Sequence, residues 1–247
     1  VWPFCIALFL EKGNNLFKKT TTLGFIISTG LAAFLTFSRN AWIGLLTSTP
    51  IVIGKKGVKF FLPLLTITIL VLFFLFSPIF EGELQNNLRG LLPREILLEF
   101  SSEGYEGLDV TRIGIYKSAF ELIKENPFFG IGAGSFTEIF FLNTTFWKGH
   151  SHNLLLELSI SYGIPATIIF FITTTYILYI SSKKIFFKKM TTDNSYIDRA
   201  FWTALFFFLI SQLTDIQYFD GKISLITWVL IAGLKNIILD MNYKTSG

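Results

Sequence analysis

Residues 153–165 read Asn-Leu-Leu-Leu-Glu-Leu-Ser-Ile-Ser-Tyr-Gly-Ile-Pro, and they follow directly on His152, one of only two histidines in the chain. The run is predominantly apolar and continues to about residue 181, so we expect a helix that enters a lipid bilayer. His152 and Asn153 then lie where this helix meets water. A titratable imidazole at such a boundary suits chemistry on a substrate with a lipid tail and a polar head.

The composition indicates a polytopic membrane protein. Of the 247 residues 51% are hydrophobic and 29 are phenylalanine, whereas only 15% are charged, and a soluble domain of this length does not hide so much apolar surface. The net charge is +4, but the lysines cluster beside apolar runs, at 55–59 and 183–189, and form no aromatic-lined basic groove. Membrane topology therefore explains the basic residues better than nucleic-acid binding does.

Apolar runs recur along the chain, at roughly 22–37, 41–54, 60–80, 153–181, 201–219 and 223–239. A helix needs about 20 residues to cross a hydrocarbon core of about 30 Å. The stretch 22–54 is too long for one ordinary span, and a single helix there would place Arg39 near the bilayer centre. Such a buried charge costs at least about 2.5–3.5 kcal/mol. Two short helices that meet at Ser38-Arg39-Asn40 avoid this cost.

This division gives the chain a consistent sidedness. The lysines of 12–19, 55–59 and 183–189, with Lys244, fall on one side, which the positive-inside rule makes cytoplasmic. Arg39 and the Asp215–Asp220 turn then face outward. We therefore expect an all-α, polytopic transmembrane helical bundle, with membrane regions at 1–80 and 152–247 around one large external loop at 81–151. The first helix is short, so we also expect the chain to be the C-terminal part of a longer protein.

The external loop contains a predicted amphipathic helix at about 111–126. Its apolar residues recur at helical spacing and are Ile113, Tyr116, Phe120 and Ile123. Asp109 or Thr111 can cap its start, Arg112 lies in its first turn and Pro127 marks its end. We expect this helix to lie along the membrane surface or against the bundle, after an exposed loop from Glu99 to Asp109.

Two short stretches combine glycine or histidine with polar neighbours. Gly130-Ile-Gly132-Ala-Gly134 is either a tight turn or a loop whose amides hold a phosphate, but it is not a dinucleotide fingerprint. His150 and His152 can ligate a metal only if carboxylates converge from elsewhere, because Cys5 is the only cysteine. Alternatively, an imidazole accepts a proton near neutral pH, or both rings simply form hydrogen bonds at a helix start.

The remaining candidates are charged residues near the outer membrane face. Arg39 and Arg112 can pair bidentately with phosphate oxygens, or each can extend to lipid headgroups. Glu157 lies just over one turn into its helix, where it can orient His152, sense a cation or pair with an arginine. Asp215 and Asp220 bracket an outer turn, and we interpret them as turn residues, with substrate contact as the alternative.

These residues together resemble the O-antigen ligase and polymerase superfamily, bacterial membrane glycosyltransferases that use polyprenyl-diphosphate-linked glycans. The resemblance covers about residues 30–180. Ser38-Arg39 is similar to the family's membrane-embedded arginine. Thr111-Arg112 through Ala119, followed by Asn126-Pro127-Phe-Phe-Gly130-Ile-Gly132, resembles its external-loop motif. His152-Asn153, with Gly163 following after nine residues, resembles the ligase's histidine motif.

The resemblance implies an inverting, metal-independent glycan transfer from undecaprenyl diphosphate that requires no cofactor. Carried over to this chain, it makes Arg39 and Arg112 the ligands of the diphosphate and His152 the acceptor of the proton from the attacking hydroxyl. We expect Asn153, Glu157, Gly163, His150, Gly130 and Gly132 to support this site. The resemblance also implies a bacterial inner-membrane protein whose active face is periplasmic. Family members have roughly a dozen spans, of which this chain has about half.

The resemblance leaves the acceptor open. We expect ligation of O-antigen to the lipid A-core of lipopolysaccharide, and a glycan polymerase or a protein O-oligosaccharyltransferase are the alternatives with the same chemistry. An alternative from another class is a small-solute or bicarbonate transporter, which calls for polar residues at midmembrane and broken helices in symmetric repeats. The polar groups instead gather at the outer face, which favours the enzyme over a transporter or a structural subunit.

Overall fold

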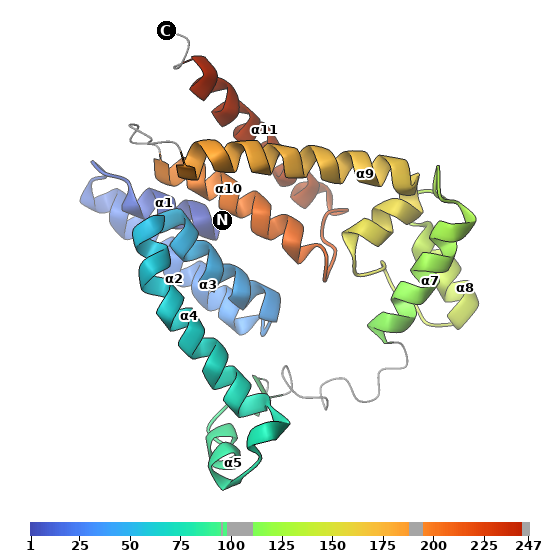
Figure 1. Cartoon of the computed structure of the whole chain (residues 1–247), viewed down its shortest axis with the longest axis horizontal. Helices are drawn as coiled ribbons and strands as arrows, with labels where there is room; N and C mark the ends of the chain where they lie inside the picture. Colours follow the sequence, from blue (N-terminus) through green and yellow to red (C-terminus); the bar gives the residue numbers. More distant parts are fainter. Residues whose placement is uncertain (95, 98–110, 188–194, 244–247) are drawn as a thin grey trace. The chain divides into compact units, whose positions relative to one another are not determined.

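The computed structural model describes residues 1–94, 96–97, 111–187 and 195–243, and no strand occurs among them (Figure 1). The predicted all-α class is confirmed. Three of the described helices are long and apolar enough to cross a membrane, over Lys55–Phe76, Leu154–Phe187 and Gly221–Asp240. The chain divides into two compact units, residues 1–107 with 191–203 and residues 108–190 with 204–247.

Among its described residues, the first unit contains α1 (Trp2–Leu10), α2 (Leu16–Leu35), α3 (Arg39–Ile53) and α4 (Lys55–Phe76), followed by α5 (Glu83–Arg89) in the external segment. The predicted break near Arg39 is confirmed. Phe37 adopts a left-handed conformation with φ of 51°, and the Ser38 side chain caps α3 by accepting a hydrogen bond from the Ala41 amide. Arg39 is therefore the first residue of a helix and does not lie in the middle of one.

Polar side chains satisfy the carbonyl groups at two helix ends in this unit. At the end of α3, the Arg199 guanidinium donates to the carbonyl oxygens of Val52 and Ile53 at 3.5 and 3.2 Å. At the end of α4, Gln85 Nε2 donates to the carbonyl of Phe74 at 2.7 Å, and α5 also carries an arginine that donates to this helix end. The last carbonyls of a helix lack intrahelical partners, so these contacts replace water there.

The second unit contains α7 (Arg112–Glu125), α8 (Ser135–Thr144), α9 (Leu154–Ser182), the short π-helix η3 (Lys183–Phe187) and α11 (Gly221–Tyr243), together with the second part of α10 (Ser195–Ser211). The apolar run 201–219 is helical only in its first part, because α10 ends at Ser211. Residues 212–220 form the connection to α11, and this connection carries Asp215.

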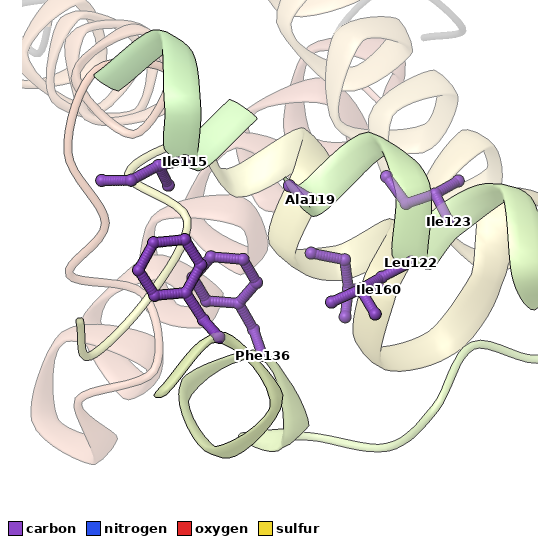
Figure 2. Packing of buried hydrophobic residues seen from close by; sticks show 7 residues of the cluster. Ile115, Ala119, Leu122, Ile123, Phe136 and Ile160 are labelled. Atoms are coloured by element: carbon purple, nitrogen blue, oxygen red, sulfur yellow. The ribbon is translucent and has the colours of Figure 1, made fainter. Parts of the chain in front are cut away.

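The amphipathic helix predicted at about 111–126 is confirmed as α7, but part of its predicted apolar face is wrong. Ile113 and Phe120 are 68% and 56% exposed. The buried face instead consists of Ile115, Ala119, Leu122 and Ile123, which pack with Phe136 and Phe140 of α8 and Ile160 of α9 (Figure 2). Both faces of α7 contain apolar residues at helical spacing, and its neighbours determine which one is covered.

The start of α7 is also defined. The Thr111 side chain accepts a hydrogen bond from the Gly114 amide at 3.3 Å and is the N-cap of the helix. The alternative cap, Asp109, and the predicted loop from Glu99 to Asp109 lie outside the described residues.

Candidate active site

The histidine motif forms a loop that α9 begins from. The Asn153 side chain caps the helix, because its Oδ1 accepts hydrogen bonds from the amides of Leu155 and Leu156 at 3.0 and 3.3 Å. His152, immediately before this cap, has a φ of 56°. Left-handed backbone at a residue other than glycine is uncommon and is concentrated at functional sites. The fold therefore holds the His152 side chain in a defined direction at the start of α9.

His152 pairs with a carboxylate from the connection between α10 and α11. Its Nδ1 lies 3.1 Å from Asp215 Oδ1, although the two residues are 63 positions apart in the sequence. A carboxylate accepts hydrogen bonds, so the neutral imidazole carries its proton on Nδ1 and donates it to Asp215. The other ring nitrogen, Nε2, then has a free lone pair. This arrangement presents His152 as a proton acceptor with a fixed tautomer.

Backbone contacts hold the two partners together. The Leu154 amide donates to the carbonyl of Gln212 at 2.8 Å, and Asn153 Nδ2 donates to the carbonyl of Leu213 at 2.9 Å. Gln212 is almost completely buried, and its Oε1 accepts from the amides of Gln217 and Tyr218 at 2.7 and 3.0 Å. The Gln212 side chain thus shapes the connection that presents Asp215, and its backbone joins that connection to α9.

His150 is the second imidazole of the site. The His152 amide donates to His150 Nδ1 at 3.2 Å, the two rings meet edge to face with centroids 4.5 Å apart, and His150 Nε2 lies 3.8 Å from Asp215 Oδ1. Partial burial lowers the pKa of His150 below its ordinary value, and the charge of His152 lowers it further, against an opposite effect of Asp215. His150 is therefore held towards its neutral form.

The same three residues are the candidate ligands of a metal ion. His150, His152 and Asp215 each offer a ligand atom within 4.8 Å of the others, so the converging carboxylate that a metal site requires is present. However, the amide bonded to His150 Nδ1 places the proton of the neutral ring on Nε2, which faces Asp215. Metal ligation through Nε2 would release this proton, move the remaining one to Nδ1 and break the bond from the His152 amide. The hydrogen bonds therefore favour proton transfer over metal ligation.

Glu157 forms a hydrogen bond to the histidine loop, residues 150–152. Its side chain is buried, with 3% exposed, and its Oε2 accepts a hydrogen bond from the Ser151 amide at 2.8 Å. Its hydrogen-bond partner is therefore in the loop itself, and no ion pair with an arginine forms in the part of the chain that the structure describes. Glu157 therefore contacts this loop through the Ser151 backbone.

The glycine-rich loop and the glycine of the histidine motif form one structure. Gly163 interrupts α9 with a φ of 83°, so the carbonyls of Ile160 and Ser161 lack their helical partners; for Ser161 that partner is Pro165, which has no N–H. The amides of Ile131 and Gly132 donate to these two carbonyls at 2.7 and 3.1 Å, and the Ile164 amide donates to the Pro127 carbonyl at 2.8 Å. The loop thus replaces missing helix bonds.

This close approach explains why the loop requires glycine. A Cβ at Gly163 would overlap the carbonyl of Phe128, and a Cβ at Gly130 would overlap the carbonyl of Ile160. Gly130 and Gly132 also have positive φ, of 68° and 100°. Of the two interpretations of the glycine stretch, the tight turn is therefore confirmed, and a phosphate cradle at the amides of Ile131 and Gly132 is not supported because they are already bonded.

The two candidate arginines have similar local settings. Arg39 is the first residue of α3 and Arg112 is the first residue of α7. A cation is disfavoured at a helix N-terminus, where the unpaired amides and the helix dipole favour an anion. The two residues belong to different units.

Asp215 and Gln212 are the site residues that the sequence analysis missed. Asp215 was interpreted as a turn residue, with substrate contact as the alternative, and its Oδ1 does accept from the Ile216 amide as a turn residue does. Nothing in the spacing of Asp215 and His152 shows that they meet. The one available signal is that polar residues, Gln212 and Asp215 among them, interrupt the apolar run 201–219.

Comparison with known proteins places these elements in one family. A family model described as O-antigen ligase matches residues 23–171, which is more than half of the chain and extends from α2 to within α9. Neither the curated proteins nor the solved structures contain a match.

Proposed function

Since the chain belongs to the O-antigen ligase family, we propose that it transfers a glycan from undecaprenyl diphosphate to a hydroxyl group at the periplasmic face of the bacterial inner membrane. The family and the three span-length helices support a membrane protein of O-antigen and polysaccharide synthesis. In our proposal the acceptor is the lipid A-core of lipopolysaccharide. The observation that carries the proposal is the His152–Asp215 pair at the start of α9.

His152 acts as the general base. The acceptor hydroxyl oxygen attacks the anomeric carbon of the donor, the bond from that carbon to the diphosphate breaks, and the electron pair leaves with the diphosphate. The hydroxyl proton moves to His152 Nε2, while Nδ1–H stays bonded to Asp215. Attack opposite to the leaving group inverts the anomeric configuration. General-base assistance of this kind contributes about 10²–10⁴-fold to the rate.

Arg39 and Arg112 bind the diphosphate. A diphosphate is a good leaving group once its charge is neutralised, and a guanidinium binds two of its oxygens in a fixed geometry. The position of each arginine in the first turn of a helix supports this role, because the helix dipole also favours an anion there. The arginines supply the positive charge at the leaving group, so the proposed reaction is independent of a metal ion.

The supporting residues fix the position of His152. Asn153 joins α9 to the connection that carries Asp215, Glu157 holds the Ser151 amide, and His150 accepts from the amide of His152. Gly130, Gly132 and Gly163 join the external segment to α9. Positioning of this kind lowers the barrier because the reacting groups are already oriented.

A strain that lacks the gene, complemented with variants of the full chain, tests the function. We expect His152→Ala to abolish attachment of O-antigen to the lipid A-core and to let lipid-linked glycan accumulate, with the protein still in the membrane. Arg39→Lys and Arg112→Lys should fail too, because a point charge does not replace the planar fork. Arg94→Lys, an arginine of the external segment to which the proposal gives no role, is the matched control and should support normal attachment.

The outcomes separate the competing functions. Normal glycan attachment with His152→Ala would remove the general-base role. Accumulation of single lipid-linked repeat units, in place of finished chains, would indicate a polymerase, and bare proteins with normal lipopolysaccharide would indicate a protein oligosaccharyltransferase. Transfer by the purified protein should persist in a metal chelator; a loss that Zn²⁺ restores would instead assign His150, His152 and Asp215 to a metal site.

A further inference from the structure

A cavity of about 500 Å³ opens beside the His–Asp pair within the second unit. This volume lies in the range of small-molecule sites in proteins, about 300–1,000 Å³. His150 forms one wall of the cavity, Glu157 lines it from α9, and Gln217, Phe219 and Asp220 line it from the connection before α11. None of these residues is used by the proposed mechanism to hold the diphosphate.

Among the residues that the structure describes, the lining contains two carboxylic acids and no lysine or arginine. The nearest lysines in the sequence, Lys148 and Lys222, adjoin lining residues but do not line the cavity themselves. In either protonation state of Glu157, this lining presents hydrogen-bond acceptors and no fixed positive charge. A phosphate or a carboxylate would therefore enter this space without a cationic partner.

Other lining groups suit an uncharged polar ligand. The Gln217 amide group offers both donors and an acceptor, and its backbone is fixed by the bond from its N–H to Gln212 Oε1 at 2.7 Å. Phe219 is 43% exposed and provides an apolar face. Ile216 adds a second apolar contact. Polar groups of fixed direction beside an aromatic ring match a sugar ring, which has hydroxyls at its rim and C–H groups on its faces.

The position of the cavity indicates whether it binds the donor sugar or the acceptor sugar. Its wall residue His150 packs against His152 with ring centroids 4.5 Å apart, so a sugar in the cavity lies on the side of the site that holds the proposed general base. The donor sugar carries a diphosphate, which needs the arginines that this cavity lacks. The acceptor sugar brings only a hydroxyl to the reaction, and it matches the lining.

We propose that this cavity is the acceptor subsite and that it selects an uncharged or amino-substituted sugar ring over one that carries phosphate or carboxylate. The assignment to the acceptor rests on the proposed glycan transfer, and the charge selectivity rests on the lining alone. An amino group on the ring would face Asp220 and Glu157 and would be favoured further.

Binding of simple sugars to the full chain in detergent micelles tests the selectivity without any transfer. The probes are the methyl glycosides of glucose, glucosamine, glucuronic acid and glucose 6-phosphate. The chain has two histidines, so the imidazole NMR signals of His150 report occupancy of the cavity. We expect the glucoside and the glucosaminide to shift these signals at concentrations about tenfold or more below those of the two anionic probes, because unmatched charge is costly at an interface.

A variant that adds a positive charge to the lining tests the charge selectivity directly. Gln217→Lys should lower the concentration at which the anionic probes bind and raise that for the glucosaminide, each by about tenfold. Lys222→Gln, which changes a charge next to the cavity but not in its wall, is the matched control and should keep the wild-type order. Equal binding of all four probes, no shift at His150, or an unchanged order in Gln217→Lys would overturn the proposal.

The two proposals fail separately. If the charge selectivity is observed but His152→Ala still attaches glycan, only the proposed transfer mechanism is wrong. If His152→Ala abolishes transfer while all four probes bind alike, only the acceptor selectivity is wrong.

Discussion

Asp215 determines which nitrogen of His152 is able to accept a proton. Its carboxylate accepts a hydrogen bond from Nδ1–H at 3.1 Å, which leaves Nε2 as the base in the proposed mechanism. In Asp215→Asn the amide can turn its N–H₂ group towards Nδ1, which stabilises the tautomer with the proton on Nε2. We expect the rate of transfer to fall about 10²–10⁴-fold, the range of general-base assistance. A transfer assay with purified protein measures this.

Asp240→Asn, near the end of α11, is the matched control for this change and should transfer at the wild-type rate. His152→Ala combined with Asp215→Asn should be no slower than His152→Ala alone, because Asp215 acts through His152. A further loss in the double variant would show that Asp215 has an independent role.

The titration of His150 is a second test at the residue scale. Burial is the larger cause that lowers its pKa, the charge of His152 adds to it, and Asp215 opposes both. We expect an NMR titration to give a midpoint below 6.5, the ordinary value. Asp215→Asn removes the opposing charge, so the midpoint should fall further. A rise in that variant would contradict the contact between His150 and Asp215.

The same shift has a consequence for stability. Because the pKa of His150 is lower in the folded than in the unfolded chain, its contribution is fully present above the unfolded value and is lost as the pH falls through the folded one. The histidine loop should therefore loosen in acid and not in alkali.

Individual residues differ in how far the sequence predicts them. His152 and Asn153 were predictable because a polar pair directly before a long apolar run marks a helix start. Asp215 was not, because its meeting with His152 depends on how α10 and α11 are joined. The turn at 212–220 has the ordinary polar residues of a connection, and only the buried Gln212 that shapes it distinguishes it.

At the scale of elements, the break in α9 is the point where the external segment forms backbone hydrogen bonds with this helix. Gly163→Ala and Gly130→Ala should each lower the free energy of unfolding by about 1–3 kcal/mol, because the added methyl group overlaps a backbone carbonyl and the native φ is positive. Thermal unfolding of the purified full chain in detergent, followed by its loss of helical signal, measures the change.

Gly114→Ala in α7 is the matched control in the same unit. Its Cβ would lie 3.7 Å from Thr111 Oγ1, which is ordinary van der Waals contact, so the stability should be unchanged or slightly higher. Equal stability of all three variants would mean that the loop does not pack on the break in α9 as described.

The elements themselves were largely predictable, whereas their partners were not. Helical spacing and the caps located α7 to within a residue or two, and the lysines with Arg39 located the break between α2 and α3. The buried face of α7 was partly wrong because Ile113 and Phe120 obey the same period as the residues that α8 and α9 cover. The docking of the glycine loop on Gly163 is a contact between distant segments, and periodicity carries no information about it.

At the scale of the whole molecule, the three proposed reactive residues share one kind of position. Arg39 and Arg112 each begin a helix, and His152 immediately precedes the cap of a third. Helix N-termini attract anions, so the binding of a diphosphate would explain why all three residues lie at helix starts. For the proposal to hold, these helix starts must face the same side of the membrane. The positive-inside rule predicts that side, because it places the lysines at 55–59 and 183–189 in the cytoplasm.

Cysteine labelling in intact cells tests this common side. With Cys5→Ser as background, Asn40→Cys next to Arg39 and Lys117→Cys on the exposed face of α7 should react with a membrane-impermeant maleimide added outside. Lys56→Cys, in the first turn of α4, should react only after the membrane is opened. If position 40 were labelled only in opened cells while position 117 reacted from outside, Arg39 and Arg112 would lie on opposite sides of the bilayer. One diphosphate does not reach both sides, so that result would leave His152 with a single arginine and would require another cation to neutralise the leaving group.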